Sequence, residues 1–376
     1  MEAILELVDE HHKAFNYINV ATAITRIAKL ARQQRRSGGS NAVIQDAPLS
    51  SDERYVKLMG LVVQELQSFQ AREVANVFSG LATLHIKCGV TADAELLVQL
   101  AEAMERVAPD MNAQNVANTF NADSKLKEAA AEMPRSLRDA LAEAAERVAP
   151  DMNAQNVANT LNAYSKLEEA AAEMPRSLRD ALAPAAERVA PDMNAQEVAN
   201  TLNAYPKLKE AAAEMPRSLR DALTKAAERV APDMNAQEVA NTLNAYSKLE
   251  AAAAEMSPSL RDALAKAVER VAPGMNAQEV ANTLNAYPKL EEAATEMPPS
   301  LRDALAEAAE RVAPDMNAQA VANTLDAYSK LVTAAAEMPL TLRRTLAAAA
   351  ARKVPDMKDM ELRMTRRACE KLGVEM

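Results

Sequence analysis

The chain contains few of the residues that interrupt helices or fill the cores of sheets. Its 376 residues include only seven Gly, four Phe and no Trp. Hydrophobic residues make up 49% of the chain and are dominated by Ala, the strongest helix former. This balance excludes a sheet protein and predicts an all-α fold.

Long apolar runs are absent as well. Charged residues interrupt every Ala-rich segment, whereas a membrane-spanning helix needs roughly 20 apolar residues. The first residues, MEAILELVDEHH, are acidic, unlike the basic start of a secretory signal or the Arg- and Ser-rich sequence of a transit peptide. We therefore expect no membrane partner, and a cytoplasmic location stays open.

The sequence also lacks the constellations that carry catalysis. Cys88 and Cys369 lie far apart and predict neither a disulfide framework nor a metal site. His11 and His12 have no neighbouring group of ligands suited to a metal. There is no Gly-rich phosphate loop and no Ser or Cys paired with a suitable His. We expect no enzyme, no metal, no cofactor and no small-molecule substrate.

One sequence motif, which reads MNAQEVANTLNAY in its third copy, recurs along most of the chain. A fixed period with atypical ends is the signature of a solenoid of repeats. Weaker copies begin near Phe15 and Phe69, and a seventh phrase at Asp356 soon diverges. The six strong copies open at a constant interval of 41 residues, at Met111, Met152, Met193, Met234, Met275 and Met316.

These copies divide the chain into three predicted parts. Residues 1–110 carry degenerate repeats with a flexible loop near 35–51, residues 111–356 carry six near-identical repeats, and residues 357–376 form a capping helix. The predicted fold is an all-α, right-handed α-solenoid of tandem helix pairs.

The third copy shows how each repeat begins. Asn194 is predicted to cap a first helix, and Glu197 completes an Asn-x-x-Glu capping box. The helix is expected from Ala195 to about Tyr205. The Met that opens each copy, and the Tyr near the end of most first helices, are expected to pack in the core. The apolar stripe of this helix is Val198, Leu202 and Tyr205.

The second helix of the same copy is predicted from its own signals. Ser218, in the tetrapeptide SLRD, is expected to cap it, and Pro232 helps to end it. The connector KLKEAAAEMP between the two helices is Ala-rich, which favours a short helical turn. The outward positions are charged and are expected to be solvated: Asp221, Lys225, Glu228 and Arg229 here, and Asp303, Glu307, Glu310 and Arg311 in a later copy.

A polar stripe follows a different face of the first helix. At 100° per residue, Gln196, Asn200, Asn203 and Lys207 fall within one sector. A purely solvated face would more often carry Glu, Lys and Arg, as the second helix does. Because this stripe is neutral amide plus Lys, a net charge of −10, the wrong sign for a simple nucleic-acid binder, can coexist with a binding surface for RNA.

The candidate RNA-binding residues are the stripe positions of all six copies, together with the residue after each Gln. They are Gln114, Asn115, Asn118, Asn121, Lys125, Gln155, Asn156, Asn159, Asn162, Lys166, Gln196, Glu197, Asn200, Asn203, Lys207, Gln237, Glu238, Asn241, Asn244, Lys248, Gln278, Glu279, Asn282, Asn285, Lys289, Gln319, Asn323, Asp326 and Lys330.

Two interpretations of the stripe are open. The amides could bond base edges while Lys meets phosphate, one nucleotide per repeat, or Asn118 and its equivalents could bond backbone or each other between stacked repeats. The residue after Gln varies among copies, as a recognition code would, but capping explains it better because Glu repels phosphate.

Basic residues also cluster near both ends of the chain, within Arg26–Arg36 and in the last third of the sequence. They could clamp phosphates that flank the repeats or be solvated helix ends, and both interpretations stay open. The second cluster is Arg343, Arg344, Arg352, Lys353, Arg363, Arg366 and Arg367.

The repeat resembles that of the octotricopeptide repeat family, which is related to the repeats of organellar proteins with a C-terminal RAP domain. That pattern is close to P-D-F-N-x-Q-x-L-A-N-T-L-W-A-L-A-K-L-G. The resemblance covers residues 111–356 well and 13–110 more loosely. The matches in the third copy are Pro191, Asp192, Asn194, Gln196, Ala199, Asn200, Thr201, Leu202, Ala204, Lys207 and Leu208.

The chain departs from the family in several places. Asn, or Asp326 in the last copy, replaces the family's Trp, and Tyr takes a position that is usually aliphatic. Pro206 and Pro288 fall where the family's first helix should continue. The C-terminus shows no RAP domain.

The resemblance implies sequence-selective binding of single-stranded RNA, in the maturation, stability or translation of transcripts of a chloroplast or mitochondrion. Because the stripe is almost the same in six copies, we expect a preference for low-complexity RNA. The alternative is a protein scaffold that grips a peptide or helix on the same stripe, which the acidic total and the missing Trp favour.

Overall fold

The computed structural model describes residues 1–36, 48–90, 93–126, 134–167, 174–208, 215–249, 256–291 and 297–375. In these residues all regular structure is helical. Among them, no helix combines the length and the apolar character needed to cross a membrane. Helix pairs follow one another through the described residues of each part of the chain, which confirms the all-α solenoid.

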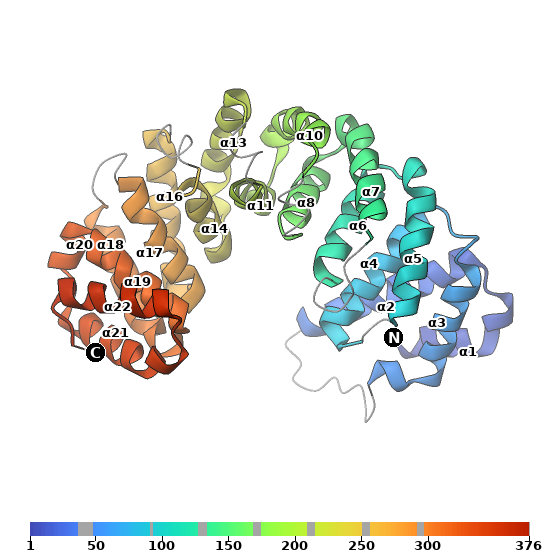
Figure 1. Ribbon diagram of the computed structural model, residues 1–376, viewed down its shortest axis with the longest axis horizontal. Coiled ribbons are helices and arrows are strands. Elements are labelled where there is room, and N and C mark those ends of the chain that lie inside the picture. The colour runs from blue at the N-terminus through green and yellow to red at the C-terminus, as the bar shows by residue number, and fades with distance from the viewer. Residues whose placement is uncertain are drawn as a thin grey trace. The chain divides into compact units, whose positions relative to one another are not determined.

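The chain forms two compact units, residues 1–186 and 187–376, and the division falls inside α10 (Arg176–Val189). In each unit the first helices of successive repeats lie side by side as one layer, and the second helices form another (Figure 1). The predicted three-part division into 1–110, 111–356 and 357–376 stays a prediction.

In the N-terminal unit the first-helix layer is α2 (Tyr17–Arg36), α4 (Ala71–Cys88), α6 (Ala113–Leu126) and α8 (Ala154–Tyr164). The other layer is α1 (Glu2–His11), α3 (Glu53–Glu65), α5 (Ala94–Val107) and α7 (Arg135–Val148).

In the C-terminal unit the first-helix layer is α11 (Ala195–Ala204), α14 (Ala236–Tyr246), α17 (Ala277–Glu291), α19 (Ala318–Lys330) and α22 (Asp359–Leu372). The other layer is α13 (Arg217–Val230), α16 (Pro258–Val271), α18 (Pro299–Val312) and α21 (Leu340–Lys353), and the short α20 (Val332–Ala336) precedes α21.

The first helices begin as the sequence predicts. In α11 the Asn194 side chain accepts from the Glu197 backbone N–H at 3.0 Å, and the Glu197 carboxylate accepts from the Asn194 N–H at 2.9 Å. The same reciprocal box opens α8 and α14. Each box satisfies two N–H groups that a helix start otherwise leaves without a partner.

The predicted cap of the second helix is wrong. α13 begins at Arg217, directly after Pro216, and no side chain caps it. Ser218 instead lies in the first turn and donates from its hydroxyl to the Glu187 carboxylate of the preceding second helix, at 2.7 Å. Proline supplies the extended backbone before the helix, so a side-chain cap is not required there.

Prolines occur near the ends of both first and second helices, and their effects on the helices differ. Pro232 ends α13, and Ala231–Asp233 forms a single 3-10 turn that leads into the next first helix. Pro206 likewise lies in a 3-10 turn after α11, whereas Pro288 lies inside α17. The expected helical turn of the connector and most of the expected loop near 35–51 fall outside the described residues.

The core takes the residues that the apolar stripe predicts. Val198, Leu202 and Tyr205 are all at most 3% exposed. The Met that opens each of the six copies is fully buried. Four of the five tyrosines, at 164, 205, 246 and 328, are buried, whereas Tyr287 is half-buried. Burial of its ring raises the pKa of Tyr246 to about 12, as expected for a phenol in the core.

An arginine near the end of the second helix, which was expected to face solvent, ties that helix to the start of the first helix of its own copy. Arg229 donates from Nη2 to the backbone carbonyl of Met193 at 2.5 Å, and Arg270 bonds the Met234 carbonyl at the same distance. Arg147 and Arg311 reach the carbonyls of Met111 and Met275, at 2.7 and 2.6 Å. The expectation that Arg229 and Arg311 only face solvent is therefore wrong.

Glutamates near the ends of the second helices bridge neighbouring repeats. Hydroxyl groups of the following second helix donate to them: Ser136 to Glu105, Ser218 to Glu187, Ser259 to Glu228, Ser300 to Glu269 and Thr341 to Glu310, at 2.6–3.3 Å. One hydroxyl–carboxylate bond thus joins each of these second helices to its predecessor, and Glu228 and Glu310 are not merely solvated.

Removing one of these arginines should weaken the stack. Arg270→Ala loses a charge-assisted bond to the Met234 carbonyl, and we expect the free energy of unfolding to fall by about 1 kcal/mol, the lower part of the usual range because Arg270 is exposed. Lys266→Ala, on the same helix and also exposed, should change it by less than about 0.5 kcal/mol. Urea unfolding of both variants measures the difference, and equal losses would contradict this role for Arg270.

Candidate nucleic-acid interface

The six glutamines of the predicted stripe are all exposed. Each follows the cap of a first helix by two residues, so its side chain leaves the first turn away from the neighbouring repeats. They are Gln114, Gln155, Gln196, Gln237, Gln278 and Gln319.

The asparagines of the stripe are half-buried, in two rows one turn apart along each first helix. The first row is Asn118, Asn159, Asn200, Asn241, Asn282 and Asn323, and the second is Asn121, Asn162, Asn203, Asn244 and Asn285, with Asp326 in the last copy.

Within the described residues these amides make few bonds to the protein. Gln278 donates from Nε2 to the Asn282 side-chain oxygen at 2.9 Å, and this bond lies within one helix. No side-chain bond joins one stripe asparagine to the next between the described repeats. The interpretation that Asn118 and its equivalents bond each other across the stack therefore finds no support. Half-buried amides prefer a partner, so these groups are available to a ligand.

The variable position after each Gln serves the helix start. Glu238 and Glu279 accept from the N–H groups of Asn235 and Asn276 at 2.8 Å, as Glu197 does in its own copy. The buried Asn115 and Asn156 do the same at 3.3 Å. The capping box accounts for every copy except the last, where Ala320 has no acceptor to offer the Asn317 N–H.

The lysines of the stripe lie at the opposite ends of the first helices from these boxes. Lys125 is half-buried, and Lys166, Lys207, Lys248, Lys289 and Lys330 are exposed. Lys330 pairs with Asp326 at 2.6 Å. Lys125, Lys166, Lys248 and Lys289 have no carboxylate partner among the described residues.

The lysines of neighbouring repeats are close enough to repel one another. Burial, followed by the charges of Arg32, Lys166 and Lys87, lowers the pKa of Lys125 to about 8. Burial, followed by the charge of Lys289, also lowers the pKa of Lys248. Each unit therefore holds cations that no carboxylate of the described residues neutralises.

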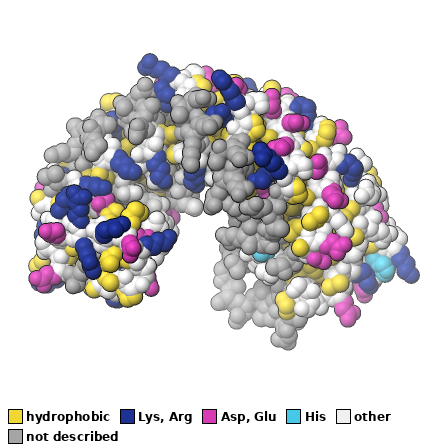
Figure 2. Space-filling view, viewed as in Figure 1, with side chains coloured by type: hydrophobic (Ala, Val, Ile, Leu, Met, Phe, Trp, Pro, Cys, Tyr) yellow, Lys and Arg dark blue, Asp and Glu magenta, His cyan; other side chains and the backbone are white. Residues whose placement is uncertain are grey.

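Acidic side chains gather elsewhere. The first-helix carboxylates are engaged, Glu197, Glu238 and Glu279 by their caps and Asp326 by Lys330. Figure 2 shows acidic side chains over α5 and α7, and basic ones over α21 and α22, on the face that it presents. In the described residues the stripe carboxylates of the six copies therefore have partners, and the acidic connectors lie outside those residues.

Three cations of this surface were not included in the predicted stripe. Lys87 and Arg32 lie near enough to Lys125 to lower its pKa, and they extend the row of cations toward the N-terminus. The copies there are diverged, so the 41-residue period does not identify them. Lys371 stands 41 residues after Lys330, in α22, so the period alone could have found it. By contrast, Arg343 of the predicted basic cluster donates to the carbonyls of Ala335 and Leu372, at 2.8 and 3.2 Å, and holds the fold.

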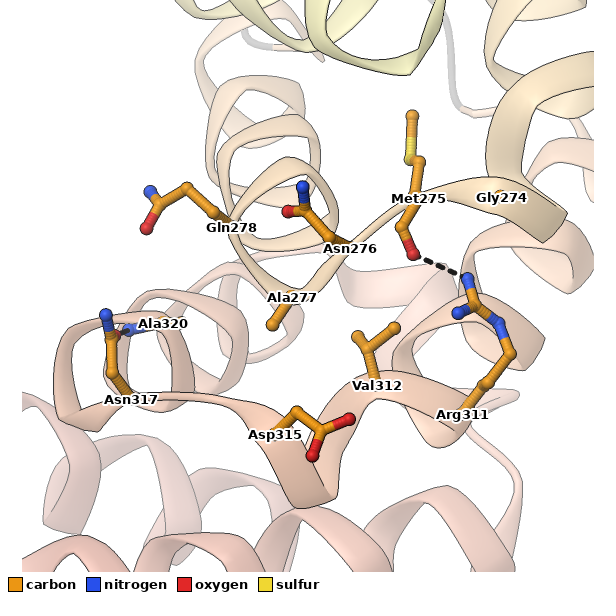
Figure 3. Close-up of a pocket in the computed structure, with 10 residues that line it drawn as sticks. All are labelled: Gly274, Met275, Asn276, Ala277, Gln278, Arg311, Val312, Asp315, Asn317 and Ala320. Carbon is orange, nitrogen blue, oxygen red and sulfur yellow. Dashed lines mark hydrogen bonds between the residues drawn. The ribbon is translucent and has the colours of Figure 1, made fainter. Parts of the chain in front are cut away.

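A pocket of about 620 Å³ opens between the fifth and sixth copies, inside the C-terminal unit. Figure 3 shows its lining, which comes from the starts of α17 and α19 and from the end of α18. Gln278 belongs both to this lining and to the stripe, so the pocket adjoins the candidate interface.

Known proteins match this arrangement only in its repeats. Six segments, 95–120, 133–161, 175–202, 215–243, 257–284 and 299–325, are similar to a family described as "Protein of unknown function (DUF1601)". Each segment joins a second helix to the first helix that follows, so the family unit and the structural repeat agree. Among curated proteins, none matches the chain.

Two solved structures match most of the chain at low similarity. "Circular tandem repeat protein with novel repeat topology and enhanced subunit contact surfaces" is 14% identical, with a TM-score of 0.33, and the match covers 94% of this chain and 98% of that one. A chain of "Homology model of the full-length AP-3 complex in an intermediate open conformation" is 9% identical, with a TM-score of 0.24, over 99% and 90%. Neither indicates a function for this chain.

Completing the capping box at Asn317 should stabilise the first helix of the last strong copy. Ala320→Glu offers an acceptor to the Asn317 N–H, as Glu279 does for Asn276, and we expect the free energy of unfolding to rise by about 0.5–1 kcal/mol. Gln319→Glu adds the same charge one residue earlier, outside the box, and should give a smaller gain. Thermal or urea unfolding compares the two, and equal gains would show that the helix dipole alone is responsible.

The charge on Lys125 should cost stability at neutral pH. Its folded pKa, near 8, lies below that of an unfolded lysine, so the unfolded chain binds more protons between about pH 8 and 10.5 and native stability rises with pH across that window. Lys125→Met should therefore be more stable than the parent at pH 7, by a margin that shrinks by pH 10. Urea unfolding at both pH values measures the margin, and the exposed Lys266→Met should show no such shrinkage.

Proposed function

We propose that this protein binds single-stranded RNA, without catalysis, along the stripe of its first helices. The observation that carries the proposal is the pairing of two features on one surface. Among the described residues, Lys125, Lys166, Lys248 and Lys289 have no carboxylate partner, and the half-buried amides beside them make almost no bonds to the protein. Unneutralised cations and unpaired amides are what a strand of phosphates and base edges requires.

The repeat of the surface suits a polymer. The same four side chains return every 41 residues, so a ligand that contacts one copy meets a similar set at the next. Under one nucleotide per repeat, as other helical-repeat readers use, the four strong copies of the C-terminal unit would contact about four nucleotides.

The difference in burial between the lysines and the amides supports different roles for them in RNA binding. The exposed lysines at the ends of the helices reach phosphates, which stay in water. The half-buried amides lie deeper, where a splayed base presents its edge to donors and acceptors. Since the amides are nearly the same in each copy, the preferred RNA is of low complexity.

The resemblance to octotricopeptide repeats supports the same class of ligand. By that resemblance we propose a role in the maturation, stability or translation of organellar RNA. A peptide or helix held on the stripe is the competing outcome, because amides also bind extended peptides.

The test compares two pairs of lysines within the C-terminal unit. Lys248→Gln with Lys289→Gln removes two stripe charges, whereas Lys225→Gln with Lys266→Gln removes two exposed charges from second helices. Binding of labelled single-stranded RNA is measured between about 50 and 200 mM salt. The stripe pair should weaken binding roughly tenfold and flatten the slope of log affinity against log salt by about 1.4, since each phosphate contact contributes about 0.7.

The control pair should leave the slope within about 0.3 of the parent value. If both pairs weaken binding equally, the effect is one of total charge and the stripe is not the interface. If the parent protein binds no RNA even at the lower salt, the proposal fails and protein partners become the target of the search.

A further inference from the structure

Two residues that line the pocket between the fifth and sixth copies have shorter side chains than their counterparts. Gly274 stands where the other strong copies have Asp, and Ala320 stands where they have Asn or Glu. Of the other lining residues, Asp315 has Gly274 as its counterpart in the fifth copy, and the rest are the same in all strong copies. Among the junctions of strong copies, this one alone combines Gly at the first position with Ala at the second.

The same two changes alter the charge of the junction. At the junction of the third and fourth copies, the equivalent residues are Asp192 and Glu238, two carboxylates that would repel a phosphate strand. In the pocket only Arg311 and Asp315 are charged. Arg311 is also held in place, because it donates to the carbonyls of Met275 and Ala272 at 2.6 and 3.2 Å (Figure 3).

The lining offers one apolar wall and several hydrogen-bonding groups. Val312 and Ala277 supply the apolar part, while the amides of Asn276, Gln278 and Asn317 stand at the helix starts (Figure 3). A volume of about 620 Å³ is in the range of pockets for small planar ligands. This combination fits a heteroaromatic ring with donors and acceptors along its edge.

The pocket is also placed where a strand on the stripe would pass. Gln278 lines the pocket, and its Nε2 donates to Asn282 of the stripe, which leaves its side-chain oxygen to accept another bond. A base that leaves the strand at this point could enter the pocket without a break in the lysine contacts on either side.

We propose that this pocket receives one unstacked nucleobase of the bound RNA and fixes the register of the strand. The inference rests on the proposed function. Six copies with almost the same stripe would let a near-uniform strand shift by one repeat at little cost. A single junction that differs from the others removes that degeneracy.

The test fills the pocket without changing its charge. Gly274→Asn and Ala320→Gln are combined in one variant. A Cβ at position 274 meets no atom within 4 Å, and Gln at position 320 can complete the capping box, so the variant should fold. Its thermal unfolding midpoint, compared with that of the parent, checks this.

RNA is then selected from a randomised single-stranded pool with both proteins. The parent should enrich sequences with one position of strong base preference, and the filled variant should lose that preference. Affinity for the selected RNA should fall about tenfold, as for loss of one base-specific contact, while affinity for an unselected homopolymer stays within about twofold.

The outcomes separate the two proposals. No RNA binding by the parent overturns the proposed function, and this inference with it. Binding by the parent with the same base preference in the filled variant overturns the pocket alone.

A reciprocal variant opens a second pocket in the same unit. Asp192→Gly with Glu238→Ala reproduces both truncations at the junction of the third and fourth copies. Under one nucleotide per repeat, its selected RNA should show a second preferred base two nucleotides from the first. A single preferred position in that variant would contradict the assignment of selectivity to the truncated pair.

Discussion

Every first helix in the middle of a unit must pack against two others, one from the preceding repeat and one from the following repeat. This constraint uses up most of the surface of the helix. Val198, Ala199, Thr201 and Leu202 are all at most 2% exposed, because they face one neighbour or the other. What remains accessible is a narrow strip, and the strip is where Gln, Asn and Lys stand. The binding surface is thus the part of the helix that the stack cannot use.

The same constraint explains which features the sequence predicted. Capping boxes and apolar stripes depend on residues within one turn or two, so Asn194, Glu197 and Leu202 could be assigned from the sequence. The bonds of Arg229 and Ser218 join residues 36 and 31 positions apart. Helical periodicity gives no information on such pairs, and both residues were assigned to the wrong environment.

Local sequence also fails where two copies with the same residues behave differently. Pro206 and Pro288 stand in identical NAYPKL segments, yet α11 ends before its proline and α17 continues past its own. The pocket could not be predicted from the sequence for a similar reason. Its two truncated positions lie 46 residues apart in sequence, in different copies, and only the stacking of those copies brings Gly274 and Ala320 into one lining.

The negative charges of the two helix layers are paired within the protein in different ways. Glutamates of the second helices bind hydroxyl groups of the next repeat, and glutamates of the first helices complete caps. Lys125, Lys166, Lys248 and Lys289, at the other ends of the first helices, have no such partner among the described residues, and Lys125 holds its charge at an energetic cost. A chain with ten excess negative charges can therefore present cations on one surface, since these carboxylates bind other parts of the protein.

The arginine bonds lie within one repeat, the glutamate bonds connect a repeat only to the one before it, and both recur in several copies. A whole copy of 41 residues could therefore be duplicated or deleted in the gene without creating an unfamiliar contact at the new junction. The length of the strand that such a protein grips would then change in whole steps, by recombination between near-identical stretches of DNA. In this architecture, the length of ligand that is bound can evolve separately from the side chains that make each contact.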